Sequence, residues 1–383
     1  MSNAVIAGYA RTPFHFARKG KLASVRPDDL AAIALRGLAA RLGLDPALIE
    51  DVVMGCAYPE GEQGDNVGRI AALLAGFPDT VGGATINRFC GSSMTAVHYA
   101  AGQIAIGAGE AFVCAGVESM TRVPQGGFSF SPNPRFKGPN TPIAEFPIET
   151  YVSMGQTAEN VAARYHVSRL DQERFALVSQ QKAAAAFAAG RLSAELISVS
   201  TADGLVEADG CLRPQTTLEG LAQLKPAFGG TVTAGTASPL TDGAAAVLVC
   251  SEEFARVHGL AVLARIRATA VAGVAPDIMG MGPVPATRKA LARAGLTIDD
   301  IDVVELNEAF ASQAVACMRD LGIPPERTNI DGGAIALGHP LGATGARIVG
   351  KAAQILKREG KRFALATQCI GGGQGIATVL EAA

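Results

Sequence analysis

Two cysteines and one histidine have neighbours that are typical of reactive groups. Cys90 lies in NRFCGSSM, His339 in GHPLGATG and Cys369 in TQCIGGGQG. A thiol has a free pKa of about 8.5 and becomes a strong nucleophile only when it is ionised, which an imidazole or the positive end of a helix can promote. Two thiols and one imidazole could therefore carry acyl transfer through a covalent thioester, with one thiol as nucleophile and the other as acid and base.

The residues around Cys90 predict a turn between a strand and a helix. Residues 84–89 favour a short strand, and residues 92–106 favour a helix rich in small side chains. We expect Ser92 and Ser93 to cap this helix, so that Cys90 lies at the positive end of the helix dipole. This placement favours a nucleophile over the usual role of a lone cysteine, which is that of a small buried hydrophobe.

The surroundings of His339 and Cys369 also favour functional roles. His339 lies in a loop bounded by glycine and proline, and such loops more often hold a side chain in a site than fill a core. The glycines after Cys369 are expected to form a turn between strands at 362–368 and 375–381. Their backbone N–H groups could point at a developing oxyanion. His98 has no such neighbours and is expected to be structural.

The composition excludes several classes of protein. With 383 residues, 49% of them hydrophobic, the chain is long enough for two or three domains. The 33 basic and 35 acidic residues leave a net charge of −2, which argues against nucleic acid or an anionic membrane as a partner. Seven scattered cysteines without a CxxC pair argue against a disulfide framework and a metal site. No apolar run reaches the roughly 20 residues of a membrane span, so we expect a cytoplasmic protein.

An internal repeat predicts how the chain is organised. Residues 35–53 align without gaps on residues 287–305, at an offset of 252 positions (288 − 36). Each copy predicts an amphipathic helix that ends at a glycine, followed by a turn and a β-branched strand. Two such copies indicate a duplicated α/β domain, with the Cys90 turn in one half and the Cys369 turn in the other. The two thiols could then meet where the halves face each other.

The chain between the two copies has a different composition. Residues 121–149 contain six prolines and four phenylalanines, which is too broken for a helix and too apolar for a free linker. Residues 153–190 again favour helix. We expect the phenylalanines to contribute to a subunit interface, because large exposed apolar patches usually mark one. The alternative is that their rings fold back on the chain and cover the acyl-binding tunnel.

Seven motifs occur in an order that resembles the thiolase family, and the resemblance covers residues 4–380. They are NRFCGSSM, MGQTAEN, VTAGTASPLTDGAAA, GPVPAT, NEAF, GGAIALGHPLGATGAR and CIGGGQG. The resemblance implies a thiolase fold, in which two duplicated α/β halves form five layers, α-β-α-β-α, with an inserted loop domain. The expected parts are an N-terminal half at 1–119 plus 248–265, the inserted domain at 120–247 and a C-terminal half at 266–383.

The resemblance also implies a role for each reactive residue. Cys90 would be the nucleophile, His339 would ionise it and donate to a thioester oxygen, and Cys369 would be the acid and base. One oxyanion hole would use the N–H groups of Cys90 and Gly371, and a second would use His339 with a water held by Asn307. The contacts expected for coenzyme A are Ser238 and Met154 beside the pantetheine, Phe310 and Met279 along the acyl tunnel, and Arg213 near the nucleotide.

The activity that these roles imply is thiolytic cleavage of 3-ketoacyl-CoA to acetyl-CoA and a shortened acyl-CoA, as in fatty-acid β-oxidation. Coenzyme A would be a substrate, and no tightly bound cofactor is expected. Short-chain biosynthetic members usually have His and Ser at the positions of Ser153 and Gly220. These two departures favour the degradative reaction.

Three alternatives stay open at this point. The same fold could condense two acetyl-CoA molecules, and chain-length profiles would separate the two directions. A ketosynthase would normally lack a second catalytic cysteine in a CIGGGQG turn. A non-catalytic acyl-CoA-binding or lipid-binding protein would have lost one of the three reactive side chains. The resemblance further implies a homodimer or homotetramer, and leaves open a partner that carries hydratase and dehydrogenase activities.

Overall fold

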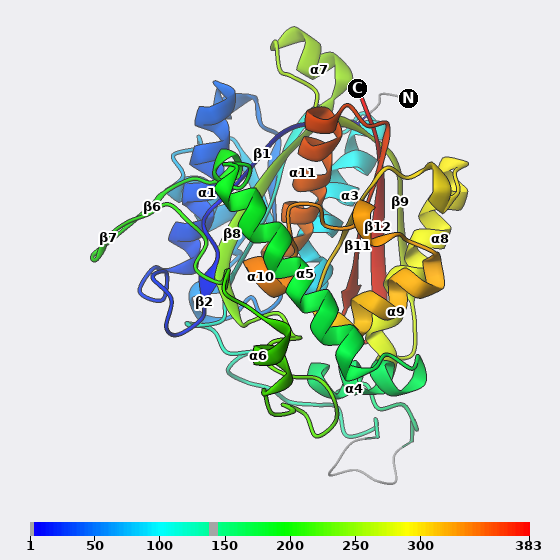
Figure 1. The fold of residues 1–383 in the computed structure, drawn as a ribbon. Helices are drawn as coiled ribbons and strands as arrows, with labels where there is room; N and C mark the ends of the chain where they lie inside the picture. The colour runs from blue at the N-terminus through cyan, green and yellow to red at the C-terminus, as the bar shows by residue number, and fades with distance from the viewer. Residues whose placement is uncertain (1–3, 138–144) are drawn as a thin grey trace.

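The strands of both halves join in one large sheet. The structure is a computed structural model that describes residues 4–137 and 145–383. Within these residues the strand order is β10-β11-β12-β9-β1-β8-β5-β3-β4, and β2 pairs with β8 beside this path (Figure 1). The strands are β1 (Ala4–Arg11), β2 (His15–Phe16), β3 (Asp51–Gly55), β4 (Gly82–Ile86), β5 (Ala111–Ser119), β8 (Thr241–Ser251), β9 (Ala264–Gly273), β10 (Val303–Leu306), β11 (Phe363–Ile370) and β12 (Gln374–Glu381).

Helices cover both outer faces of this sheet and fill the space between its two parts. The helices are α1 (Pro27–Leu42), α2 (Val67–Leu74), α3 (Ser92–Ala105), α4 (Met154–Arg164), α5 (Arg169–Ala188), α6 (Leu218–Ala222), α7 (Glu252–Val257), α8 (Pro283–Ala294), α9 (Ala311–Leu321), α10 (Ala334–Leu337) and α11 (Leu341–Glu359). Helix α1 packs on β5 and β8, whereas α8 packs on β9 and β12. Helices α3 and α11 pack on each other in the middle. The expected five layers are therefore confirmed.

Three apolar clusters hold these layers together. The first joins α1 and α2 to the sheet and includes Leu35 and Val52. The second surrounds α3 and α11 and includes Met94 and Ile348. The third lies under α8 and α9 and includes Leu365. Because every layer is apolar on the side that faces its neighbour, burial of these faces drives the stacking.

The predicted repeat is confirmed by matching elements. Helix α1 ends before Gly43, which has φ of 60°, and α8 ends before Gly295, which has φ of 70°. Glycine is favoured at both positions because it adopts this left-handed conformation at little cost. A short 3-10 turn and a parallel strand follow each glycine. The central strands β5 and β11 start at residues 111 and 363, so they keep the offset of 252 (363 − 111).

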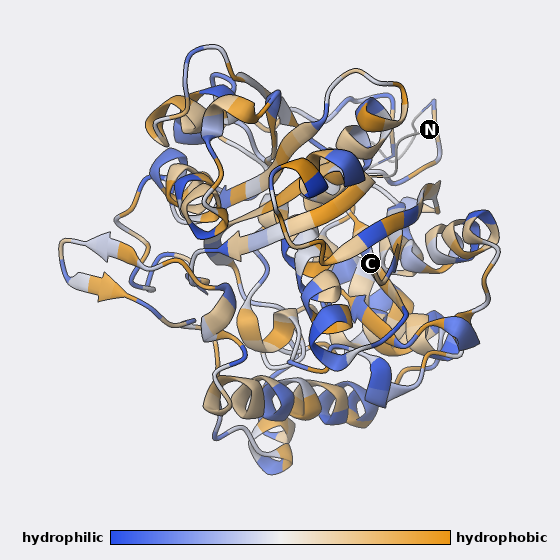
Figure 2. Cartoon of the chain, turned by 90° about the horizontal axis from the view of Figure 1, so that it is seen from above, coloured by the Kyte–Doolittle hydropathy of each residue, from blue (hydrophilic) through white to orange (hydrophobic). Residues whose placement is uncertain are grey.

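The segment between the halves contains two long helices and a small hairpin. The predicted helical region at 153–190 divides into α4 and α5, which the chain separates at residues 165–168. The hairpin of β6 (Val199–Thr201) and β7 (Gly204–Val206) stands out from the rest of the ribbon (Figure 2). Two of the six prolines predicted to break the chain at 121–149, Pro139 and Pro142, lie outside the described residues.

Strand β8 crosses the domain boundary that we expected at 247/248. It pairs with β1 on one side and with β5 on the other, so it belongs to the sheet of the N-terminal half from its first residue, Thr241. The expected boundaries remain predictions, and the pairing of β8 favours an insertion that ends before residue 241. Across residues 4–137 and 145–383, the helices are too short or too polar for any of them to cross a membrane.

Candidate active site

Cys90 lies in a tight turn between β4 and α3, as predicted. Strand β4 ends at Ile86, and a 3-10 turn at Phe89–Gly91 leads directly into the helix. Phe89 has φ of 44°, in the left-handed region that non-glycine residues seldom adopt. Its N–H donates to Oδ1 of Asn87 at 2.8 Å, and this local bond ends the strand earlier than the predicted residue 89.

The prediction that Ser92 and Ser93 cap α3 is wrong. The N-cap is Gly91, and no side chain caps the helix. Ser92 Oγ instead accepts from the N–H of Arg88 at 2.9 Å and so closes the turn. Ser93 Oγ accepts from the N–H of Ala346 at 2.8 Å and so ties α3 to α11. Both serines stabilise the surroundings of Cys90, but through the turn and the neighbouring helix.

The two cysteine turns meet, as the repeat predicted. Gln368 Nε2 donates to the carbonyl oxygen of Cys90. The backbone N–H groups of Gly371 and of Cys90 itself favour the ionised form of the Cys90 thiol and so act to lower its pKa. A Cβ atom at Gly91 would lie 2.5 Å from Cδ1 of Ile370, so a larger residue there would displace the Ile370 side chain. The two N–H groups that favour a thiolate at Cys90 thus come from different halves of the chain.

Cys369 is fully buried beside Cys90. It belongs to an apolar cluster with Met154, Met279 and Phe310, three of the residues expected to contact substrate. Burial raises the pKa of the Cys369 thiol well above its ordinary value, and a negative charge on the nearby Cys90 would raise it further. Cys369 is therefore a protonated thiol in the resting protein and can serve as a proton donor.

Hydrogen bonds fix the tautomer of His339. The Thr344 hydroxyl donates to the carbonyl of Pro340 at 3.0 Å, so its oxygen accepts from Nδ1–H of His339 at 2.7 Å. Nε2 is then unprotonated, and it lies 3.3 Å from Nδ2 of Asn307, which donates to it. The backbone N–H of His339 donates to Oγ1 of Thr241 at 3.0 Å. The lone pair on Nε2 of the imidazole therefore faces the Asn307 amide.

The buried site favours neutral forms of both Cys90 and His339. Burial raises the pKa of the Cys90 thiol to about 12, although the backbone N–H groups of Gly371 and Cys90 act in the opposite direction. Burial, together with the charge of Arg347, lowers the pKa of His339 to about 3. At neutral pH Cys90 is therefore a thiol and His339 a neutral imidazole.

Asn307 offers an acceptor as well as a donor. Its Oδ1 atom is buried and has no hydrogen-bond partner within the described part of the chain. A buried amide oxygen of this kind is costly unless something donates to it. It is therefore suited to hold a water or a substrate group beside His339.

Comparisons with known proteins show the family of the chain. The family profile described as "Thiolase, N-terminal domain" matches residues 4–253, and "Thiolase, C-terminal domain" matches residues 260–382. The chain belongs to the thiolase family. A protein of Pseudoalteromonas translucida named 3-ketoacyl-CoA thiolase is 49% identical over 100% of this chain and 99% of its own length. Proteins of the same name from Bacillus subtilis and Shewanella denitrificans are 46% and 47% identical over 100% of both chains.

The expected coenzyme A contacts of this thiolase fall in two places. Arg213 lines a cavity of about 340 Å³ together with Gly220 and Gly235, and neither Cys90 nor Cys369 lines it. Its guanidinium carbon lies 4.8 Å from the centroid of the Phe16 ring. Ser238 lies nearer the reactive cysteine, because its N–H donates to the carbonyl of Ala309, which packs in the Cys369 cluster.

Ser153 and His98 have structural roles in the thiolase chain. Ser153, which precedes the MG of MGQTAEN, caps α4 by accepting from the N–H of Gln156 at 3.3 Å. His98 lies 2.8 Å from Oγ1 of Thr378, as expected for a structural histidine. A larger cavity, of about 510 Å³, lies between α5 and α9 and contains none of the predicted site residues. The described part of the chain holds no cluster of three or more His, Cys, Asp and Glu side chains suited to a metal ion.

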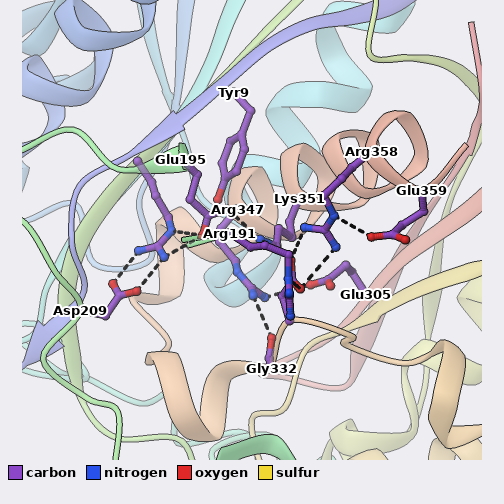
Figure 3. A network of polar contacts seen from close by, with 12 residues as sticks. Tyr9, Arg191, Glu195, Asp209, Glu305, Gly332, Arg347, Lys351, Arg358 and Glu359 are labelled. Carbon is purple, nitrogen blue, oxygen red and sulfur yellow. Dashed lines mark hydrogen bonds and ion pairs between the residues drawn. The ribbon is translucent and has the colours of Figure 1, made fainter. Parts of the chain in front are cut away.

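A buried network of ion pairs connects α11 to β1 and to the segment between the halves (Figure 3). Arg11 on β1 pairs with Glu195 at 2.7 Å and with Asp209 at 2.6 Å, both in the segment between the halves. Lys351 on α11 pairs with Glu195 at 3.3 Å and with Asp331 at 2.8 Å. Each charge has an opposite partner, so loss of one would leave the other buried and uncompensated. The network fixes α11, which begins two residues after His339.

Sequence reasoning missed several polar residues that hold the reactive groups in place. Thr241 and Thr344 lie within two of the family motifs, and Gln368 directly precedes Cys369. Glu118 at the end of β5 was also missed, although its carboxylate accepts from the N–H groups of Ala57 at 2.8 Å and Gly342 at 2.9 Å. Gln368 and Thr344 lie near reactive residues in the sequence, whereas Thr241 and Glu118 do not. The hydrogen-bond partners of these residues were not visible in the sequence, because most of them lie far away along the chain.

Proposed function

We propose that the chain cleaves 3-ketoacyl-CoA with coenzyme A, through an acyl thioester on Cys90, to acetyl-CoA and an acyl-CoA shortened by two carbons. One observation carries this proposal: the Cys90 turn of one half meets the Cys369 turn of the other half, where Gln368 Nε2 donates to the carbonyl oxygen of Cys90. The names of the relatives, 3-ketoacyl-CoA thiolases over their full length, support the same reaction.

The first half-reaction transfers the acyl group to Cys90. His339 Nε2 accepts the thiol proton as the sulfur attacks the keto carbon, and the N–H groups of Cys90 and Gly371 donate to the resulting oxyanion. The C2–C3 bond then breaks and leaves the enolate of acetyl-CoA. The protonated His339 and a water held by Asn307 stabilise its oxygen, and Cys369 gives its proton to its carbon. Acetyl-CoA departs, and Cys369 remains as a thiolate.

The second half-reaction returns the acyl group to coenzyme A. The Cys369 thiolate accepts the proton of the incoming CoA thiol, which attacks the thioester carbon on Cys90. The tetrahedral intermediate again places its oxyanion between the N–H groups of Cys90 and Gly371. Collapse releases the shortened acyl-CoA, and the Cys90 sulfur takes the proton back from His339. Cys90, His339 and Cys369 all end in their starting protonation states.

The two groups of coenzyme A contacts support an extended binding mode. The nucleotide would lie at the 340 Å³ cavity beside Arg213, and the thiol end would reach the cluster of Cys369. The segment from Gly235 to Ser238 runs from the first place to the second and would follow the pantetheine. Phe310 and Met279 would form the wall of the acyl tunnel. Coenzyme A is then a substrate, and no step calls for another cofactor.

The direction of the reaction is tested by its chain-length profile. Purified wild type is assayed for CoA-dependent cleavage of 3-ketoacyl-CoA substrates from C4 to C16, with Cys90→Ser as the inactive variant. Cys114→Ala is the matched control, because Cys114 is a buried thiol on β5 that donates to the carbonyl of Ala96 at 3.3 Å and packs in the cluster around α3 and α11. Cleavage of substrates longer than C4 by wild type and the control supports the degradative reaction. Activity on acetoacetyl-CoA alone would favour the biosynthetic thiolase.

We also propose that the chain works as a homodimer or homotetramer. Phe128 and Phe130 are 60% and 63% exposed, and Tyr151 is 42% exposed. The rings of Phe130 and Tyr151 pack edge to face with centroids 5.8 Å apart, so part of this aromatic surface is already ordered in the monomer. Exposed aromatic surface of this kind supports a subunit interface over a cover for the acyl tunnel.

A further inference from the structure

An acidic residue, Glu308, follows Asn307 directly and has no part in the reaction described above. Glu308 is 1% exposed and lies where β10 leads into α9. Its carboxylate accepts three hydrogen bonds: from Ser179 Oγ at 2.6 Å, from the N–H of Ile335 at 3.1 Å and from Asn329 Nδ2 at 2.8 Å. No residue of the described chain forms an ion pair with it. Burial of a carboxylate whose hydrogen-bond donors are all neutral costs free energy, so its contacts call for an explanation.

Two of these contacts reach the loop that carries His339. Ile335 lies on α10, which ends two residues before His339. Gly333 lies so close that a Cβ atom there would be 2.1 Å from the carboxyl carbon of Glu308. The N–H of Gly333 donates to Ser179 Oγ at 3.2 Å, so the serine on α5 joins the same carboxylate and the same loop.

The third contact reaches the strand end that carries Asn307. Asn329 Oδ1 accepts from the N–H of Leu306 at 2.9 Å, and its Nδ2 donates to the Leu306 carbonyl at 2.8 Å. Asn329 thus pairs with the residue before Asn307 while it also donates to Glu308. Asn307 and His339, the two residues of the proposed second oxyanion hole, are therefore both connected through hydrogen bonds to the carboxylate of Glu308.

We propose that Glu308 is a positioning residue that sets the distance between Asn307 and His339. It aligns the donors for the enolate oxygen of acetyl-CoA and so serves the step that breaks or forms the C2–C3 bond. The inference rests on the proposed function. His339 has anchors of its own in Thr241 and Thr344, and the donors at Cys90 do not touch Glu308, so acylation of Cys90 does not depend on it.

Glu308→Gln tests this role, because the amide keeps the shape but turns an NH2 group toward a donor. Two activities are measured on the same preparations. One is thiolysis of a 3-ketoacyl-CoA, and the other is exchange of a butyryl group between butyryl-CoA and labelled CoA, which uses Cys90 but breaks no carbon–carbon bond. We expect kcat for thiolysis to fall about 10- to 100-fold, since a misplacement of about 1 Å can cost about 100-fold. Exchange should stay within about threefold of wild type, and KM should not change.

A double-mutant cycle separates positioning from a general loss of structure. Asn307→Ala with Glu308→Gln should lose no more thiolysis than Asn307→Ala alone, because the two residues act as a unit. Glu173→Gln is the matched control, since Glu173 is a buried carboxylate on α5 that pairs with Arg169 at 2.6 Å. It should change neither activity. Ser179→Ala removes only one donor from Glu308, so it should give a smaller loss of thiolysis. If Glu308→Gln does not fold, Ser179→Ala tests the positioning role in its place.

Three results would overturn the inference. They are unchanged thiolysis in both Glu308→Gln and Ser179→Ala, equal loss of thiolysis and exchange in folded variants, and additive losses in the double mutant. A wild type that exchanges acyl groups but cleaves no 3-ketoacyl-CoA would instead contradict the proposed function. The two failures are therefore distinguishable in one set of assays.

Discussion

Thr344→Val should slow acylation of Cys90 without unfolding the protein. Thr344 is nearly isosteric with valine, and its hydroxyl oxygen accepts from Nδ1–H of His339 at 2.7 Å. With the hydroxyl gone, Nδ1–H becomes a buried donor without an acceptor. The imidazole then prefers to carry its proton on Nε2, where it can no longer accept the thiol proton.

The size of the effect follows from burial of both groups. Thr344 and His339 are 1% and 4% exposed, so water does not replace the lost acceptor. An unsatisfied buried donor costs about 1–3 kcal/mol. Since 1.36 kcal/mol is a factor of ten, the useful tautomer and the acylation rate should fall about 5- to 150-fold. Binding of substrate should change little, because the hydrogen bonds of the Thr344 hydroxyl go to His339 and Pro340.

Single-turnover acylation measures this directly. Enzyme in excess is mixed with acyl-CoA, and formation of the acyl-enzyme is followed in time for wild type, Thr344→Val and Thr344→Ser. The serine variant keeps the hydroxyl and should stay within a few-fold of wild type. Equal rates for valine and wild type would refute the assigned tautomer, and equal losses in valine and serine would indicate that the methyl group, and not the hydroxyl, matters.

Three further predictions test other parts of the account. Cys369→Ala should keep acylation of Cys90 by acyl-CoA but lose 3-ketoacyl-CoA thiolysis, because protonation of the enolate has no donor; full thiolysis would place the acid elsewhere. Alkylation of Cys90 by iodoacetamide, followed on its peptide, should rise from pH 7 to pH 9 without a plateau, because burial raises the thiol pKa to about 12; a plateau below pH 8 would show a resting thiolate. The double variant Phe128→Ser with Phe130→Ser should lower the molar mass in light scattering and keep short-chain activity; an unchanged mass with altered chain-length preference would mean that the rings cover the tunnel.

Local patterns in the sequence predicted the helices, strands and turns that position the site. The repeated helix, glycine and strand were predicted because Gly43 and Gly295 end their helices through backbone geometry that depends on few neighbours. The turn at Cys90 was predicted for the same reason. The meeting of the two cysteine turns followed from duplication, since matching halves place matching turns at one interface.

Features that depend on distant partners were not predicted. Ser92 and Ser93 have the residue type of a helix cap, but Arg88 and Ala346 provide better partners for them in the folded chain. The tautomer of His339 depends on where Thr344 directs its hydroxyl, which sequence patterns do not report. Strand β8 was divided between two expected domains, because its pairing with β1 and β5 joins residues more than 100 positions apart.

The central claim is that Cys90 carries the acyl group between the two substrates. Wild type is incubated with acyl-CoA, quenched in acid and digested, and the peptides that contain the seven cysteines are analysed by mass spectrometry. The account predicts the acyl mass on the Cys90 peptide and its loss on addition of CoA, with no such adduct in Cys90→Ser. An acyl group on the Cys369 peptide, or turnover by Cys90→Ser at the wild-type rate, would contradict the account.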